Sequence, residues 1–261
     1  EYVRRHISDV AVAGKNGSIE PTLTTGDLGR TVTFKFKPDA GYRVRDVKVN
    51  GKSVGAVDSY TYSGLKIYSR ITVEFTNGTM PFTDVHTNDW FYNDVAYVYE
   101  AGLFAGTSDT TFSPYASMTR GMLVTVLYRL EGRPSVTGTS VFDDVARGAY
   151  YEKAVIWAAE HKIVNGTGGS KFSPDANVTR EQMAAILYRY AQYKGYRTSS
   201  RAGLSGFADY QTVSSYAETP MQWAVAEKLI NGSNGSLLPR GNATRAQVAA
   251  ILHRFVENIV K

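Results

Sequence analysis

The sequence predicts a multidomain chain, in which a small all-β domain precedes a mainly α-helical region made of three repeats. Apolar and polar residues alternate through residues 32–49, which is typical of half-buried strands. From Pro81 onward the apolar spacing becomes helical, and one pattern returns three times. The phenylalanines that begin the copies, Phe82, Phe142 and Phe207, are 60 and 65 residues apart. Together these observations favour two kinds of domain over one continuous fold.

The composition limits the class of protein. The chain has 261 residues, of which 43% are hydrophobic, enough for more than one core. It contains no run of about 18 apolar residues, so no membrane span is predicted. Cysteine is absent, which excludes disulfides and thiolate metal sites. The net charge of +5 favours an anionic partner, but no basic run or zinc-finger signature points to nucleic acid.

Residues 1–78 are expected to form the all-β domain, with about five or six strands. The chain opens on EYVRRHISDVAVAG, which reads as a strand, so we expect it to be part of a longer protein. The pair Asn50-Gly51 lies between two alternating segments and is a strong hairpin signal. Residues 71–75, ITVEF, give a closing strand before a short linker.

Each repeat holds a helical pattern, a glycine turn, a Pro-containing loop and a second helix. The turns are LFAGT, IVNGT and LINGS, and the loops are FSPYASMTR, FSPDANVTR and LLPRGNATR. A copy of this size cannot bury a core alone, so we expect the three copies to share one. The predicted boundaries are residues 79–134, 139–195 and 204–261.

A Thr-Arg pair begins the second helix of every copy. Each threonine is expected to cap its helix, and in copies two and three a glutamine three residues later completes a capping box. In the first copy Met122 stands at that position, so its box is incomplete. The capping residues are Thr119, Thr179, Thr244, Gln182 and Gln247.

The arginine of each pair lies at the first helical position, where the helix dipole disfavours a cation by about 0.3–1 kcal/mol. One interpretation is a structural salt bridge, with Glu181 or the aspartate of each Phe-x-Asp motif as the partner. The other is an anion site, in which free helix amides and the guanidinium bind a carboxylate or phosphate. The threefold repetition favours the anion site. The arginines are Arg120, Arg180 and Arg245.

Other residues recur at the same spacing and could line a groove. The aspartates could cap the first helix or bond a sugar hydroxyl, and the glycines could make a turn or let a ligand approach the backbone. Trp90 could stack on a sugar or lie in a core, whereas Trp157 and Trp223 have apolar helical spacing and are predicted to be core. The recurring residues are Asp84, Asp144, Asp209, Gly106, Gly166 and Gly232.

The motifs Phe-x-Asp-Val, Gly-Thr, Phe-Ser-Pro-Asp and Thr-Arg-Glu-Gln resemble tandem S-layer homology modules, over about residues 81–261. The resemblance implies a pseudo-threefold, trimer-like helical unit with grooves between modules. It also implies an extracellular surface protein of a Gram-positive bacterium, held non-covalently on an anionic, often pyruvylated, secondary cell wall polysaccharide. By the same resemblance the repeated arginines, aspartates and glycines, with Trp90, line the grooves.

The third copy departs most from the family pattern. Its loop carries Arg240 in place of an aspartate, and Ser215 stands where the first copy has Trp90 and the second has Tyr150. The glutamate that usually closes the Thr-Arg motif is replaced in all three copies. We therefore expect the first two grooves to be better formed than any groove built from the third copy.

The β domain is similar to divergent internalin-type B repeats of bacterial extracellular proteins. The segments that carry the similarity are GSIEP, FKPDAGYRVRDVKVNGKSVGAV and ITVEF. The similarity implies a spacer or an adhesive module that binds a protein partner, and it names no ligand.

Two other functions stay open: a lattice or adhesin fragment, and the non-catalytic C-terminal part of a wall-associated enzyme. Glycoside hydrolysis needs two carboxylates about 5–10 Å apart, and the adjacent pair Asp143-Asp144 does not recur in the other copies. The four histidines lack metal-ligand spacing, and Asp109 and Asp175 lack an EF-hand pattern. No catalytic residue, metal or cofactor is therefore predicted.

Overall fold

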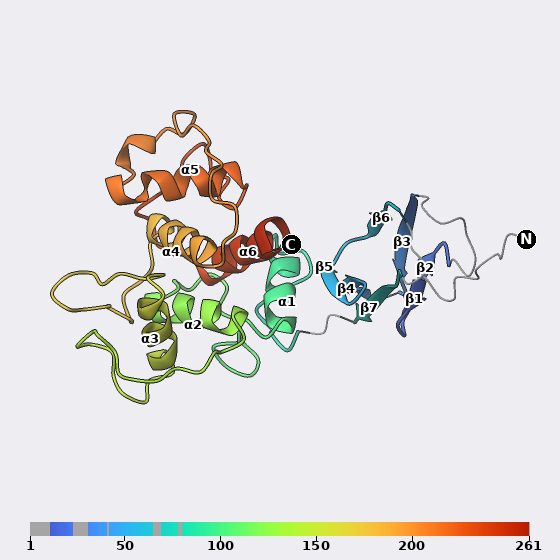
Figure 1. Ribbon diagram of the computed structural model, residues 1–261, viewed down its shortest axis with the longest axis horizontal. Coiled ribbons are helices and arrows are strands. Elements are labelled where there is room, and N and C mark those ends of the chain that lie inside the picture. Colours follow the sequence, from blue (N-terminus) through green and yellow to red (C-terminus); the bar gives the residue numbers. More distant parts are fainter. Residues whose placement is uncertain (1–10, 23–30, 41, 65–68, 78–79, 261) are drawn as a thin grey trace, which may run out of the picture. The chain divides into compact units, whose positions relative to one another are not determined.

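A computed structural model describes residues 11–22, 31–40, 42–64, 69–77 and 80–260. Its contacts divide the chain into a unit that ends at Thr79 and a unit from Met80 to Val260 (Figure 1). The first unit is built of strands and the second of helices, so the predicted fold class is confirmed. Among the described residues, no helix combines the length and the apolarity that crossing a membrane requires. The boundaries of the individual modules stay predictions.

Seven strands are described in the β unit, where five or six were expected. They form two sheets, with strand orders β1-β7-β4-β5 and β2-β3-β6. Their bounds are β1 (Ala11–Ala13), β2 (Gly17–Glu20), β3 (Val32–Pro38), β4 (Arg43–Val49), β5 (Lys52–Gly55), β6 (Ser59–Tyr62) and β7 (Ile71–Thr76). Residues 1–10 of the predicted opening strand lie outside the described residues.

Local sequence signals account for these strands. The alternating residues of β3 are buried and exposed in turn, as the sequence pattern predicts. Asn50 and Gly51 both have positive φ, 52° and 82°, and they join β4 to β5 with Val49 opposite Lys52. The predicted hairpin is therefore confirmed. The buried side chains of the unit are Ile19, Val32, Phe34, Phe36, Val44, Val47, Ile71 and Val73.

The helical unit contains two α-helices from each repeat. The first helices are α1 (Tyr92–Glu100), α3 (Glu152–Glu160) and α5 (Glu218–Ala226), and the Thr-Arg helices are α2 (Arg120–Leu130), α4 (Arg180–Tyr193) and α6 (Arg245–Phe255). Short 3₁₀ segments, η1 (Tyr210–Thr212) and η2 (Ser215–Ala217), precede α5, and a π-helical segment, η3 (Val256–Val260), follows α6.

The first helices pack across the repeats. Helix α3 packs on α2, α5 packs on α4, and α1 packs on α6, so each first helix contacts the Thr-Arg helix of the preceding copy in a cycle. The cycle closes because α1 of the first copy packs on α6 of the third copy.

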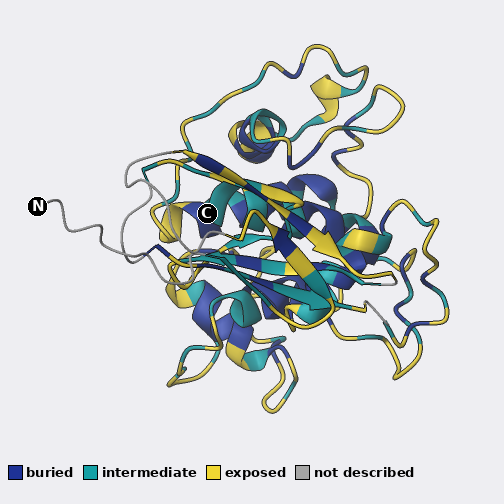
Figure 2. Ribbon diagram, turned by 90° about the vertical axis from the view of Figure 1, so that its right-hand side faces the viewer, coloured by how far each residue is buried: buried dark blue, intermediate teal, exposed yellow. Residues whose placement is uncertain are grey.

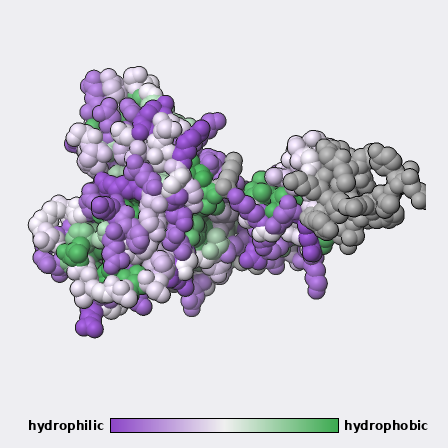
Figure 3. Space-filling model, in the orientation of Figure 1, coloured by the Kyte–Doolittle hydropathy of each residue, from purple (hydrophilic) through white to green (hydrophobic). Residues whose placement is uncertain are grey.

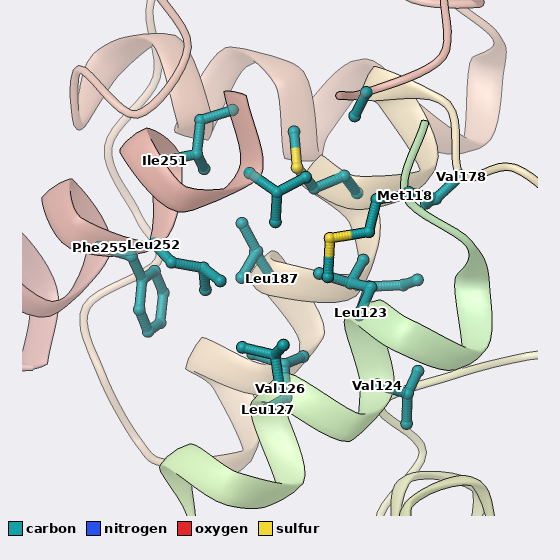
Figure 4. Close-up of a cluster of buried hydrophobic side chains, with 14 of the residues drawn as sticks. Met118, Leu123, Val124, Val126, Leu127, Val178, Leu187, Ile251, Leu252 and Phe255 are labelled. Carbon is teal, nitrogen blue, oxygen red and sulfur yellow. The ribbon is translucent and has the colours of Figure 1, made fainter. Parts of the chain in front are cut away.

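A single core joins the three copies. Leucines and a phenylalanine from α2, α4 and α6, including Leu123, Leu187 and Phe255, point toward one another (Figure 4). Trp157 and Trp223 are 1% and 0% exposed, so their prediction as core residues is confirmed. Figure 2 shows most of the loops as exposed, whereas the helices carry buried segments.

A ring of backbone hydrogen bonds holds the starts of the Thr-Arg helices together. The amide of Met118 donates to the carbonyl of Ala243 at 2.9 Å, that of Val178 to Met118 at 2.9 Å, and that of Ala243 to Val178 at 3.0 Å. Each of these residues directly precedes a capping threonine. Every copy donates to one neighbour and accepts from the other, so the unit has pseudo-threefold symmetry.

Candidate functional site

The capping predictions for the Thr-Arg helices are confirmed. Thr179 and Thr244 form complete capping boxes with the glutamines three residues later. In the first copy the side chain of Thr119 accepts from the amide of Met122, but the reciprocal bond is missing because methionine cannot make it.

The other amides at these helix starts are already bonded, so the expected receptor of free amides is wrong. In α2, the amide of Arg120 donates to Ala176 at 2.9 Å, and the amide of Gly121 donates to Pro174 at 2.8 Å. Both carbonyls belong to the Pro-containing loop of the second copy. The first two amides of α4 and of α6 donate in the same way to carbonyls of the next loop in the cycle. The loop of the neighbouring copy therefore occupies the place where an anion would bind.

The side chain of Arg120 also reaches into the next copy. Its Nε donates to the carbonyl of Phe172 at 2.9 Å, and its Nη2 donates to the carbonyl of Asn165 at 3.1 Å. The guanidinium carbon lies 4.7 Å from the centroid of the Phe172 ring, within the range of a cation–π contact. Arg120 is only 5% exposed, so these contacts join two copies inside the protein.

Arg245 repeats this arrangement between the third copy and the first. Its Nε donates to Phe112 and its Nη2 to Ala105, each at 2.7 Å, and the guanidinium lies 4.5 Å from the Phe112 ring centroid. Arg180, between the second copy and the third, donates through Nε to Leu237 at 2.8 Å. The partners of the three arginines are thus backbone carbonyls, which explains why a cation is tolerated at a helix start.

The salt-bridge interpretation is wrong for these arginines, because none of them forms an ion pair with a described residue. The buried carboxylate of Glu181 instead accepts from the amide and hydroxyl of Ser214, at 2.9 and 2.8 Å, and from the hydroxyl of Tyr216 at 3.2 Å. Burial lowers the pKa of Arg180, and the charge of Asp209 opposes that change. Arginine nevertheless stays charged in proteins.

The repeated aspartates hold the Pro-containing loops of their own copies. Both carboxylate oxygens of Asp144 accept backbone amides, from Phe172 and Ser173, each at 2.8 Å. Burial acts to raise the pKa of Asp144, but the backbone hydrogen bonds outweigh it and lower the pKa below its usual range. Asp84 and Asp209 make the equivalent pairs of bonds. Their predicted part in polymer binding stays a prediction.

The turn glycines are required by close packing. A Cβ atom on Gly166 would lie 2.6 Å from the carbonyl oxygen of Lys171, and one on Gly106 would lie still closer to the carbonyl oxygen of Ser108. Gly232 also has a φ of +74°, which favours glycine, whereas the other two do not have positive φ.

Two hollows lie where these turns meet the Thr-Arg helices. The first, which we call the Arg120 groove, has a volume of about 320 Å³, and the second, the Arg180 groove, about 220 Å³. The Arg120 groove is lined by Arg120, Asn165, Gly166, Thr167, Gln182, Ala185, Ile186, Arg189 and Tyr216. The Arg180 groove is lined by Trp90, Arg180, Leu229, Ile230, Asn231, Gly232, Ser233, Gln247, Ala250, Ile251 and Arg254. Neither lining contains a carboxylate.

A second arginine in each groove was missed by the sequence analysis. Arg189 faces the groove of Arg120, and Arg254 faces the groove of Arg180. An equivalent second arginine lies near Arg245: it is Arg129, a charged neighbour. The Nη1 of Arg129 donates to the carbonyl of Leu103. These arginines follow the Thr-Arg arginines by nine residues, in the strings LYRL, LYRY and LHRF.

An exposed aromatic ring from a third copy completes each groove. Trp90 is 60% exposed and lines the Arg180 groove, so it is not a core residue. In the Arg120 groove the position equivalent to Trp90 is Tyr216. The expectation that Ser215 occupies this position is therefore wrong by one residue. Burial, together with the Glu181 carboxylate, raises the pKa of Tyr216 to about 12, so the hydroxyl keeps its proton at neutral pH.

The rest of the described surface adds no metal site. Within the described residues, no three His, Cys, Asp or Glu side chains gather in a way that could hold a metal ion. The visible face of the helical unit is mostly hydrophilic, with small apolar patches (Figure 3). The arginine-lined grooves are therefore the clearest candidate site.

Three segments of the helical unit, residues 81–121, 141–184 and 206–249, match the model of the S-layer homology domain. The chain is 33% identical to an endoglucanase of Bacillus sp. (strain KSM-635) over 69% of its own length and 19% of that protein. It is 30% identical to the surface-layer 125 kDa protein of Lysinibacillus sphaericus, over 61% and 13% of the two chains.

An amylopullulanase of Thermoanaerobacterium thermosulfurigenes is 24% identical over 97% of this chain and 14% of its own length. The chain thus spans about a fifth or less of these relatives. The family segments begin at residue 81, so the resemblance of the β unit to internalin-type repeats stays a prediction.

Proposed function

Residues 81–249 carry three tandem S-layer homology domains, and we propose that they anchor a surface protein non-covalently to the bacterial cell wall. The domains, together with relatives that include surface-layer proteins, indicate a location at the cell surface. The ligand we propose is an anionic secondary cell wall polysaccharide that carries acidic, pyruvylated sugars.

The observation that supports an anionic sugar is the make-up of the grooves. Each described groove brings two arginines from neighbouring copies together with one exposed aromatic ring, and its lining contains no acidic residue. Two guanidinium groups without a carboxylate partner favour an anion. The ring offers a flat apolar face beside them, which suits the C–H face of a sugar.

A polymer can occupy more than one such groove at a time. The second contact then forms within one complex, so the affinity for the polymer exceeds that for a single sugar. For the recurring aspartates and glycines we propose a supporting role, in which they fix the loops that frame the grooves.

We propose that the described chain itself is non-catalytic. The relatives include an endoglucanase, an amylopullulanase and surface-layer proteins, and the anchoring module is what such different proteins can share. The β unit, residues 1–78, would act as a spacer or as a site for a protein partner. The proposed modules span residues 79–134, 139–195 and 204–261.

The test removes the groove arginines that bear least on the fold. Arg189 makes no hydrogen bond or ion pair with a described residue, and Arg254 makes one long bond to Leu229 at 3.3 Å. The double variant Arg189→Ala/Arg254→Ala should weaken sedimentation with purified walls of the source bacterium about tenfold or more, and acid extraction of the polymer should abolish it.

A matched control variant loses the same two positive charges at positions outside the grooves. The double variant Arg147→Ala/Arg240→Ala removes two exposed arginines that line neither groove, and it should bind walls like the wild type. If both double variants lose binding equally, general charge attraction explains the result and the groove site is wrong. If acid-extracted walls still bind, the ligand is not the polymer.

A further inference from the structure

Arg180 differs from its two counterparts in what its guanidinium binds. Arg120 and Arg245 donate through Nη2 to the carbonyl of the residue that precedes the turn glycine. Among the described residues, Arg180 donates through Nε alone, to Leu237 at 2.8 Å. The residue is 7% exposed and lines the groove, so its two Nη groups are held at the groove wall without a bond to a described residue.

The turn of the third copy accounts for the missing bond. Four residues, 233–236, separate Gly232 from Leu237, whereas five residues, 167–171, separate Gly166 from Phe172. The shorter turn closes with a bond from the amide of Ser233 to the carbonyl of Ser236 at 2.7 Å, and Gly232 takes a φ of +74°. Neither Gly166 nor Gly106 has positive φ, so the backbone before the glycine takes a different course only here.

Two other groups face the same groove. Arg254 lines it with one long hydrogen bond to a described residue, and Trp90, at 60% exposure, gives it an aromatic face. A guanidinium whose two Nη groups point the same way matches the two oxygens of a carboxylate or a phosphate, and a fixed fork loses little entropy on binding.

We propose that the Arg180 groove is the principal site of the chain for the acidic group of the ligand, which the paired Nη groups of Arg180 bind in a bidentate manner. The proposal rests on the proposed function and adds the choice of groove. It reverses the sequence-based expectation that a groove built from the third copy is the less well formed one. The ligand is a sugar ring that carries an oxyanion, either a planar carboxylate or a tetrahedral phosphate.

The test restores the missing carbonyl while it keeps Arg180. In the graft variant, residues 233–236 are replaced by the five-residue sequence of 167–171, so that the turn matches that of the second copy. Calorimetry with a pyruvylated N-acetyl amino sugar, and separately with a sugar phosphate of equal size, measures the single-site affinity. The graft should weaken binding of the preferred probe about tenfold, because the carbonyl then competes for Nη2.

Two further variants test the proposal independently of whether the graft folds. Arg180→Lys keeps the charge but loses the fork, and it should give a loss of similar size. Tyr115→Ala removes an aromatic ring that is 70% exposed and does not line the groove, and it should bind like the wild type.

The outcomes separate the two proposals. If the wild type binds neither probe nor the wall polymer, the proposed function fails. If the wild type binds and Arg189→Ala, in the Arg120 groove, costs as much as the graft or more, the choice of groove is wrong while the function stands. If the sugar phosphate binds more tightly than the pyruvylated sugar, the acidic group is a phosphate.

Discussion

Replacing Arg245 with alanine is the sharpest test of how the repeats are held together. The side chain donates two hydrogen bonds, each of 2.7 Å, to the carbonyls of Phe112 and Ala105, more than 130 residues earlier in the chain. Its guanidinium also lies over the rings of Phe112 and Phe104. The substitution therefore removes contacts that join the last copy to the first.

The size of the effect follows from these contacts. A hydrogen bond to a charged group contributes about 1.5–3 kcal/mol, and a partly desolvated cation–π contact about 0.5–2 kcal/mol. The unfavourable burial of the charge disappears with the side chain and offsets part of the loss. We expect Arg245→Ala to lower the free energy of unfolding by about 3 kcal/mol, which is about 6–12 °C in Tm for a unit of this size. Arg180→Ala, which removes one bond, should cost about half as much.

Urea unfolding followed by tryptophan fluorescence measures these differences, because Trp157 and Trp223 are buried in the helical unit. The exposed Arg147→Ala variant serves as the control for loss of one charge. Arg245 does not join the copies in this way if Arg245→Ala unfolds at the same urea concentration as the wild type. A larger loss for Arg180→Ala than for Arg245→Ala would contradict the larger number of contacts of Arg245.

Three smaller changes test the frame of the grooves. Thr179→Ala removes the cap of α4 and should cost about 1 kcal/mol in a thermal melt; no loss would contradict the capping box. Gly166→Ala places a Cβ 2.6 Å from the carbonyl of Lys171 and should lower Tm, whereas Gly203→Ala has open space and should not. Asp144 has a lowered pKa when folded, so its stabilisation is present above about pH 4 and is lost as the pH falls through the folded pKa. Asp144→Asn should therefore flatten the acid side of a plot of Tm against pH, and an unchanged acid slope would contradict this role.

Features that depend on residues close in the sequence could be predicted. The caps at Thr179 and Thr244 need only one other residue, the glutamine three positions later, whose backbone amide and side chain both bond to the threonine. The hairpin at Asn50-Gly51 needs two residues that accept positive φ, and the burial of Trp157 follows from helical spacing. Because each signal lies within one turn of chain, tertiary packing does not reverse it.

The destination of the Thr-Arg arginines could not be predicted in this way. The acceptors of Arg120 lie 45 and 52 residues away in the next copy, and no pattern within one repeat indicates them. The helix amides were expected to be free for the same reason, since the loop carbonyls that accept their hydrogen bonds belong to a neighbouring copy.

The second groove arginine had a signal that was overlooked. Arg189 follows Arg180 by nine residues, which at about 100° per residue places it half a turn around the helix. Helix α4 therefore supplies one arginine to each of two grooves. Tyr216 was missed because one additional residue before α5 shifts the aromatic position past Ser215.

The most direct test of the central claim is a calorimetric titration of the helical unit with polymer purified from the wall, before and after chemical removal of its acidic groups. We expect tight binding of the acidic polymer and loss of binding when the acidic groups are gone, because the grooves present paired arginines without a carboxylate. Equal affinity for the acidic and the neutral polymer would contradict the claim that these grooves recognise an anion.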